Sequence, residues 1–296
     1  MAAADSYHGS GGPVTTTVTS ATISVPRVGG LRRALYAVRG RAYPRVVGAM
    51  REPSWLFYDI VLPLLGAVAF VFVYRALGAP PRFTGYVIMG GATLAFWMNV
   101  MWNMAAQFYW EKHQGNLELY LAAPCGLVPI LLGMAVGGLL GTSVRAVVVV
   151  LTGALLFQAP LPVSSWPAFA AIVLLGLVAL YGLGMVFSSL FLLWGREAWH
   201  TVQLLQEPVY LVSGFYFPVR ALGPWVGMVA SLIPITLALD GLRQVMFPGV
   251  HPALAPLAWE VGGLAVLAVL FTALALRVLR LMELLARREG RLSFRW

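Results

Sequence analysis

The chain has 296 residues, of which 60% are hydrophobic and only 10% are charged, and its formal net charge is +9. Soluble domains carry about 25% charged residues, so this composition excludes an ordinary soluble domain and indicates an integral membrane protein. Solid apolar runs, rather than an alternating pattern over about ten residues, predict membrane-spanning helices and an all-α fold. Nearly every basic residue is arginine, which fits a GC-rich bacterial genome.

The N-terminal region divides into two segments. Residues 1–26 are rich in Ser, Thr and Gly and lack the apolar core of a signal peptide, so we predict a disordered cytoplasmic tail. Residues 27–52 contain seven arginines, and an apolar stripe on one helical face precedes Pro44, which interrupts the pattern; the stripe is Leu31, Ala34, Leu35 and Val38. This segment is predicted to be an amphipathic helix in the membrane interface, with a solvated helix as the alternative.

Six membrane spans follow within a transmembrane domain of residues 27–280. We expect them at about 55–77, 85–109, 127–157, 168–193, 202–217 and 257–276. Between the last two spans, two short apolar segments separated by Pro234 predict a short re-entrant helical hairpin. Residues 281–296 form a basic tail. Arginines flank the spans at both ends of the chain, which predicts two cytoplasmic termini and so an even number of spans rather than seven.

The stretch EKHQGNLELYLAAP, residues 111–124, is a polar interruption on the predicted cytoplasmic side. Asn116 can cap the first turn of a short helix, and Glu118 lies near the positive end of its dipole. Leu117, Tyr120, Leu121 and Pro124 share one face, which fits a groove on a soluble partner. The alternative is an ordinary loop between two spans.

Two motifs in this order resemble those of ABC-2 type transporter permeases. The first is similar to E-x-x-x-G-T-L-E-x-x-x-x-x-P…L-G-K and consists of Glu111, Gly115, Leu117, Glu118, Leu121, Pro124, Leu132 and Gly133. Asn116 replaces its Thr and Met134 replaces its Lys. The second is similar to S-G-x-x-F-P…L-P…P-x-T…R and consists of Ser213, Gly214, Phe217, Pro218, Leu222, Pro224, Pro234, Thr236 and Arg243. The resemblance covers about residues 30–280.

The resemblance implies a permease subunit of an ATP-driven exporter in the bacterial cytoplasmic membrane, moving a drug, a lipid or a (lipo)oligosaccharide or polysaccharide. It implies a dimer with a second copy or a paralogue, and two partner ATPase subunits that bind ATP and Mg. The implied ATPase-coupling surface is Glu111, Gly115, Asn116, Leu117, Glu118, Tyr120, Leu121 and Pro124. The implied external re-entrant region includes Ser213, Gly214, Phe217, Pro218, Pro234 and Arg243.

The sequence contains none of the catalytic or metal-binding motifs that we searched for. It contains no nucleotide-binding P-loop and no hydrolase or zinc-protease motif, and its four histidines have no metal-ligand spacing. We therefore expect neither enzymatic activity nor a bound cofactor or metal in this chain. A passive channel or a scaffold without an ATPase is the alternative function, and a membrane enzyme is a third.

Two further features concern the spans. Arg145 and Glu207 are charged residues within predicted spans, and they are expected either to pair or to contact a polar substrate. Asp59 is expected near the cytoplasmic end of the first span, facing the interface. Gly133, Gly137 and Gly141 recur every four residues on one face, which predicts close helix packing either within the chain or at a dimer seam.

Overall fold

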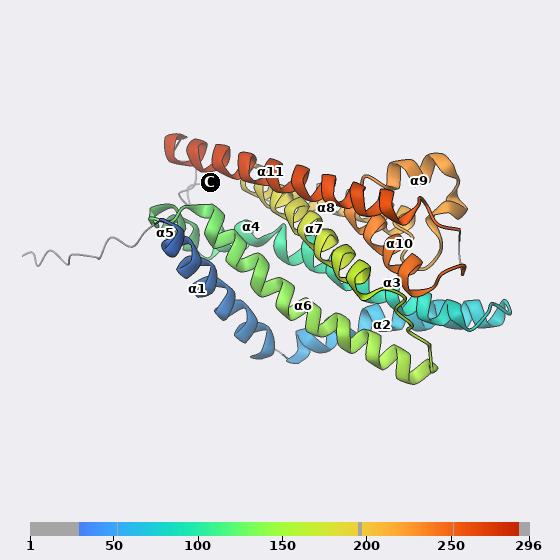
Figure 1. Ribbon diagram of the computed structural model, residues 1–296. Coiled ribbons are helices and arrows are strands. Elements are labelled where there is room, and N and C mark those ends of the chain that lie inside the picture. The colour runs from blue at the N-terminus through green and yellow to red at the C-terminus, as the bar shows by residue number, and fades with distance from the viewer. Residues whose placement is uncertain (1–29, 52, 195–196, 251, 290–296) are drawn as a thin grey trace, which may run out of the picture.

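A computed structural model describes residues 30–51, 53–194, 197–250 and 252–289, and all its regular elements are helices (Figure 1). The α-helices are α1 (Gly30–Arg51), α2 (Pro53–Ala76), α3 (Arg82–Met98), α4 (Gln107–His113), α5 (Asn116–Ala122), α6 (Leu127–Phe157), α7 (Trp166–Trp194), α8 (Glu197–Val212), α9 (Pro224–Ala230), α10 (Pro234–Met246) and α11 (Leu257–Glu289). A π-helix, η1 (Asn99–Met104), links α3 to α4, and a short 3-10 helix, η2 (Val219–Leu222), precedes α9. The predicted all-α fold is confirmed.

Four described helices are long and apolar enough to cross a membrane, within α2, α6, α7 and α11. Two others, α3 with 17 residues and α8 with 16, are shorter. Many large apolar side chains on the outer helix faces are exposed, among them Phe72, Leu155 and Val269. Apolar surface of this extent indicates contact with lipid, so the chain is a multi-pass membrane protein.

The long helices run side by side and give the molecule two distinct ends (Figure 1). The end that holds α5 also holds α1 and the C-terminal part of α11. The opposite end holds α9 and α10, which form a bent pair at 111°. The continuous run of α3, η1 and α4 connects one end to the other.

Several predicted boundaries differ from the structure. Pro44 does not interrupt α1, which continues through it to Arg51. Helix α8 ends at Val212, five residues before the predicted end of the fifth span, and the chain turns at Ser213. The last helix extends to Glu289, so the described part of the predicted basic tail, residues 281–289, is helical. The predicted disordered tail, residues 1–26, lies outside the described residues.

Helix α1 packs closely along the first half of α6, and glycines make this approach possible. A Cβ atom on Gly133 would lie 2.6 Å from the Val38 carbonyl oxygen, and one on Gly137 would lie 2.8 Å from the Ala42 carbonyl oxygen. Both glycines are therefore used within the chain rather than at a dimer seam, and only packing within the chain is confirmed. The predicted apolar stripe of α1 is only in part its packing face, since Val38 packs against Gly133 whereas Leu31 and Leu35 are exposed.

Candidate functional site

The candidate site is a buried carboxylate, Glu111, at the end of the molecule that holds α1, α4 and α5. Glu111 lies on α4, and its residue is only 3% exposed. A buried carboxylate is costly unless it is paired and hydrogen-bonded. Its surroundings therefore reveal what holds these three helices together.

Glu111 accepts hydrogen bonds from side chains of all three helices. The guanidinium of Arg41 on α1 pairs with Oε1, which also accepts a bond of 2.8 Å from the amide of Gln107 on α4 itself. On α5, the Asn116 amide and the Tyr120 hydroxyl donate to Oε2 over 2.9 Å and 2.7 Å. One carboxylate thus fixes α1 and α5 to α4. We call these five residues the Glu111 network.

A second arginine of α1 extends this attachment one turn further along the helix. Arg45 donates to the side-chain oxygen of Gln107 and, over 3.3 Å, to the backbone oxygen of Asn103 in η1. The guanidinium of Arg41 also lies over the Tyr120 ring, 5.0 Å from its centroid. These contacts join α1 to the π-helix, a type of distortion that is frequent at functional sites.

The local structure of α5 corrects the predicted cap. The N-cap is Gly115, whose φ of 74° is a left-handed conformation that glycine adopts at little cost. Asn116 is the first helical residue, and its side chain bonds to Glu111 instead of capping the backbone amides. The turn between α4 and α5 is therefore set by glycine.

Two residues of the α5 face that was predicted to contact a partner, Leu117 and Tyr120, are instead turned into the chain, whereas Pro124 is exposed. Leu117 is 1% exposed and belongs to the core, and Tyr120 is bound to Glu111. Burial and the bond to the Glu111 carboxylate raise the pKa of Tyr120, so it stays a neutral donor. Glu118, Leu119 and Ala122 of α5 are exposed, Leu119 to 68%. The prediction that Leu117 and Tyr120 anchor a partner is wrong.

The membrane charges do not pair as predicted. The guanidinium of Arg145 on α6 pairs with Asp59 on α2 and donates over 3.2 Å to the Gly141 carbonyl. Glu207 is exposed on α8. The structural partner of Arg145 is therefore Asp59, and the predicted pairing with Glu207 is wrong. Asp59 was predicted to face the membrane interface, but its carboxylate pairs with Arg145 within the chain.

At the opposite end of the molecule, Arg243 joins the two halves of the second motif. It is buried on α10 and donates to the Gly214 and Phe215 carbonyls, each over 2.6 Å, in the turn that follows α8. Its guanidinium carbon also lies 3.5 Å from the centroid of the Tyr86 ring on α3. A Cβ on Gly90 would lie 1.5 Å from the Phe215 oxygen, so α3 must carry glycine there. Arg243 thus supplies hydrogen bonds to backbone carbonyls of the turn that follows α8.

The remaining residues predicted for this end lie around the same turn. Ser213 is fully buried, Phe217 and Pro218 are partly buried, and Pro234 is the buried first residue of α10. Sequence reasoning missed Tyr86 and Gly90 here, Arg41 and Gln107 in the Glu111 network, and Arg45 beside that network. No close group of three or more His, Cys, Asp or Glu side chains occurs in the described part of the chain.

The arrangement is that of a multi-pass helical membrane domain, with a short polar helix held at one end and a bent helix pair at the other, which fits a membrane transport subunit. Comparison with known families agrees, because the model of the ABC-2 type transporter family matches residues 45–247. The chain belongs to the ABC-2 type transporter family.

Individual relatives are more distant. The chain is 29% identical over 135 residues to the probable multidrug ABC transporter permease YbhR of Escherichia coli K12, covering 46% of this chain and 36% of YbhR. It is 26% identical over 186 residues to the inner membrane transport permease YadH of the same strain, covering 63% of this chain and 70% of YadH. The chain thus matches about a third of the length of YbhR and over two thirds of that of YadH.

Proposed function

We propose that this protein is the membrane subunit of an ATP-driven exporter in a bacterial inner membrane. The observation that carries the proposal is the position of α5, which the Glu111 network holds while Glu118 and Leu119 point outward. A short helix with a fixed inner face and an exposed apolar residue suits docking to a soluble partner. The names of the relatives, a multidrug permease and an inner membrane transport permease, support this reading.

In the proposed topology, six spans cross the membrane with both termini in the cytoplasm. They are α2, the run from α3 to α4, α6, α7, α8 and α11, and the bent pair of α9 and α10 re-enters from the outside. This places α5 and the Glu111 network on the cytoplasmic side, where ATPase subunits would bind. It places Arg243 and its turn on the external side.

The proposed mechanism moves these helices together. When the ATPase subunits bind ATP and approach each other, they displace α5. Because Glu111 joins α5 to α4 and α1, the displacement passes to both helices. Helix α4 continues through η1 into α3, and α3 contacts the Arg243 turn at the far end. The chain of contacts therefore offers a physical route from ATP binding to the Arg243 turn at the external end.

The proposed partners follow from this mechanism. Two ATPase subunits supply the ATP and Mg sites, and this chain catalyses no reaction itself. A second copy or a paralogue completes the transport path. The substrate belongs to one of three classes: drugs, lipids, or (lipo)oligosaccharides and polysaccharides.

The test is co-purification with a candidate ATPase subunit from the same organism, followed by ATP hydrolysis in liposomes. We expect Leu119→Asp to weaken ATPase binding about thirtyfold, because truncating or charging a large apolar anchor costs about 2 kcal/mol. Leu281→Asp is the matched control, since Leu281 is exposed on the same side but on α11. Equal binding by both variants would refute the docking role of α5. Failure of the unmodified chain to bind any ATPase would favour a passive channel.

A further inference from the structure

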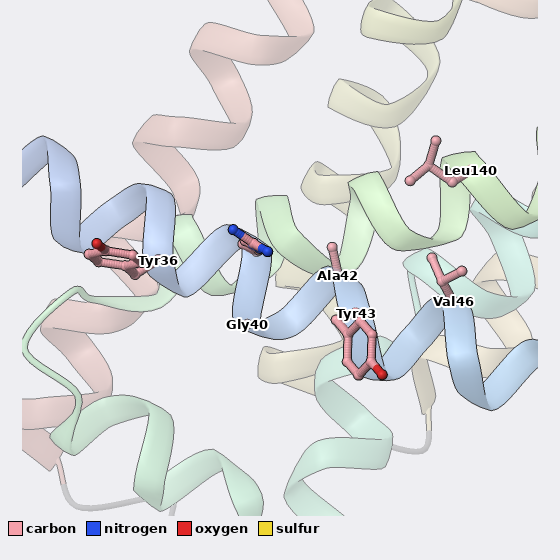
Figure 2. A pocket seen from close by; sticks show the side chains of 7 residues that line it. Tyr36, Gly40, Ala42, Tyr43, Val46 and Leu140 are labelled. Atoms are coloured by element: carbon pink, nitrogen blue, oxygen red, sulfur yellow. The ribbon is translucent and has the colours of Figure 1, made fainter.

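A shallow groove lies between α1 and α6, beside the Glu111 network but on the opposite face of α1 (Figure 2). Its volume is about 650 Å³, within the range of small-molecule sites. Tyr36, Arg39, Gly40, Tyr43 and Val46 of α1 and Leu140 of α6 line it. Figure 2 shows Tyr36 and Tyr43 projecting from α1, with Val46 and Leu140 near the far end. The groove is apolar at that end, Tyr36 and Arg39 lie toward the other end, and Tyr43 lies between them.

No acidic side chain within α1 balances the positive charge of its arginines. Six arginines and no acidic residue occur between Gly30 and Arg51. Arg41 and Arg45 turn toward Glu111 and Gln107, but Arg39 lies in the groove. The only ion pair that α1 forms with described residues is that of Arg41. The groove side of α1 is therefore suited to an anion.

The depth of the groove in the bilayer follows from α6. This helix has 31 residues and so spans about 46 Å, whereas the hydrocarbon core is only about 30 Å thick. The Phe157 end lies beside Phe72 near the end of α2, and Arg145 pairs with Asp59 near its start. The excess length of α6 therefore lies on the side of α5. Leu140 is only five residues from Arg145, so the apolar end of the groove is close to the hydrocarbon edge.

The polar end of the groove lies further toward the cytoplasm. Tyr36 is ten residues from Val46, which is about 15 Å along the helix. This distance is long enough to pass from the hydrocarbon edge through the headgroup layer. Tyrosine and arginine are the residues that favour this layer, and basic clusters there attract anionic lipids.

We propose that the groove binds an anionic phospholipid of the cytoplasmic leaflet. The lipid phosphate contacts the Arg39 guanidinium, and one acyl chain lies along the Tyr43 ring, Val46 and Leu140. This inference uses the proposed orientation of the chain but not its export activity. A bound lipid would stabilise α1 on its outer side, while the Glu111 network holds it on the inner side. Lipid composition would thereby influence how firmly α1 is docked.

The test is native mass spectrometry of the delipidated full-length protein, without ATPase, titrated with three probes. These are phosphatidylglycerol, phosphatidylcholine with the same acyl chains, and glycerol 3-phosphate. We expect phosphatidylglycerol to bind more tightly than the other two. Arg39→Ala should weaken phosphatidylglycerol binding about fivefold, because one basic residue raises the affinity for an anionic lipid by about this factor. Binding of phosphatidylcholine should not change.

Two further variants separate the groove from charge alone. Gly40→Phe keeps every charge and fits the helix, since nothing lies within 4 Å of a Cβ at Gly40, and it should weaken both lipids by filling the groove. Arg277→Ala removes an exposed arginine from α11 and should change neither. Equal effects of Arg39→Ala and Arg277→Ala, no effect of Gly40→Phe, or equal affinity for glycerol 3-phosphate and phosphatidylglycerol would each overturn the proposal. Labelling the termini from either side tests the orientation independently.

Discussion

Replacing Glu111 by alanine should detach α1 and α5 from α4, because this carboxylate accepts hydrogen bonds from both. The substitution leaves Arg41 without its ion-pair partner and removes the acceptor of Gln107, Asn116 and Tyr120. Removing one partner of a fully buried ion pair costs about 3–5 kcal/mol. The Arg41 side chain is 28% exposed and can reach water, so we expect a smaller loss of about 2–3 kcal/mol.

The assay is thermal unfolding of the purified protein in detergent. A loss of this size should lower Tm by about 5–10 °C for a protein of this length. Glu111→Gln keeps the volume and one acceptor oxygen, so its Tm should fall by about half as much. Glu118→Ala is the matched control, because Glu118 is an exposed carboxylate on the neighbouring helix α5 and should change Tm little.

A double-mutant cycle isolates the ion pair itself. Arg41→Ala combined with Glu111→Ala should destabilise less than the sum of the two single variants, with a coupling of about 1 kcal/mol or more. Two results would refute the reasoning: additive losses in this cycle, or a Tm for Glu111→Ala equal to that of Glu118→Ala. Either would mean that Glu111 does not hold these helices together.

Three other substitutions test the packing at separate places. Gly133→Val should undock α1 and reduce the folded yield seen by size-exclusion chromatography, since its Cβ would meet the Val38 carbonyl. Gly90→Ala should disrupt the external turn and lower Tm, because its Cβ would overlap the Phe215 oxygen, and an unchanged Tm would contradict this geometry. Asp59→Ala and Arg145→Ala should be non-additive in Tm, whereas Glu207→Ala should be additive with Arg145→Ala.

The sequence predicts the helices well, because the apolar runs that cross a membrane are long and uninterrupted. The third predicted span, residues 127–157, has the same bounds as α6. Errors arise where local signals compete with packing. Pro44 predicts an interruption of the helix, yet α1 continues through it alongside α6. The end of α8 reads as apolar to Phe217, but the chain turns at Ser213 and Arg243 satisfies the freed carbonyls.

The candidate site was only partly predictable, because its partners come from distant parts of the chain. Glu111 is separated from Arg41 by 70 residues, and no spacing rule connects them. The heptapeptide of α5 shows which residues share a face but not which face is buried. Leu117 and Tyr120 therefore appeared to be anchors for a partner, although they pack within the chain. Arg145 found its partner in Asp59 because α2, rather than α8, lies beside α6.

Cross-linking from Leu119 tests most directly the claim that α5 docks to an ATPase. Leu119→Cys in a Cys125→Ser background, labelled with a maleimide–benzophenone reagent and irradiated in assembled membranes, should cross-link to the ATPase subunit. Trp225→Cys, exposed on α9 at the opposite end, should not. The account predicts a permease–ATPase adduct for Leu119→Cys alone. It is contradicted if Leu119→Cys stays freely labelled by maleimide in the assembled complex and yields no adduct.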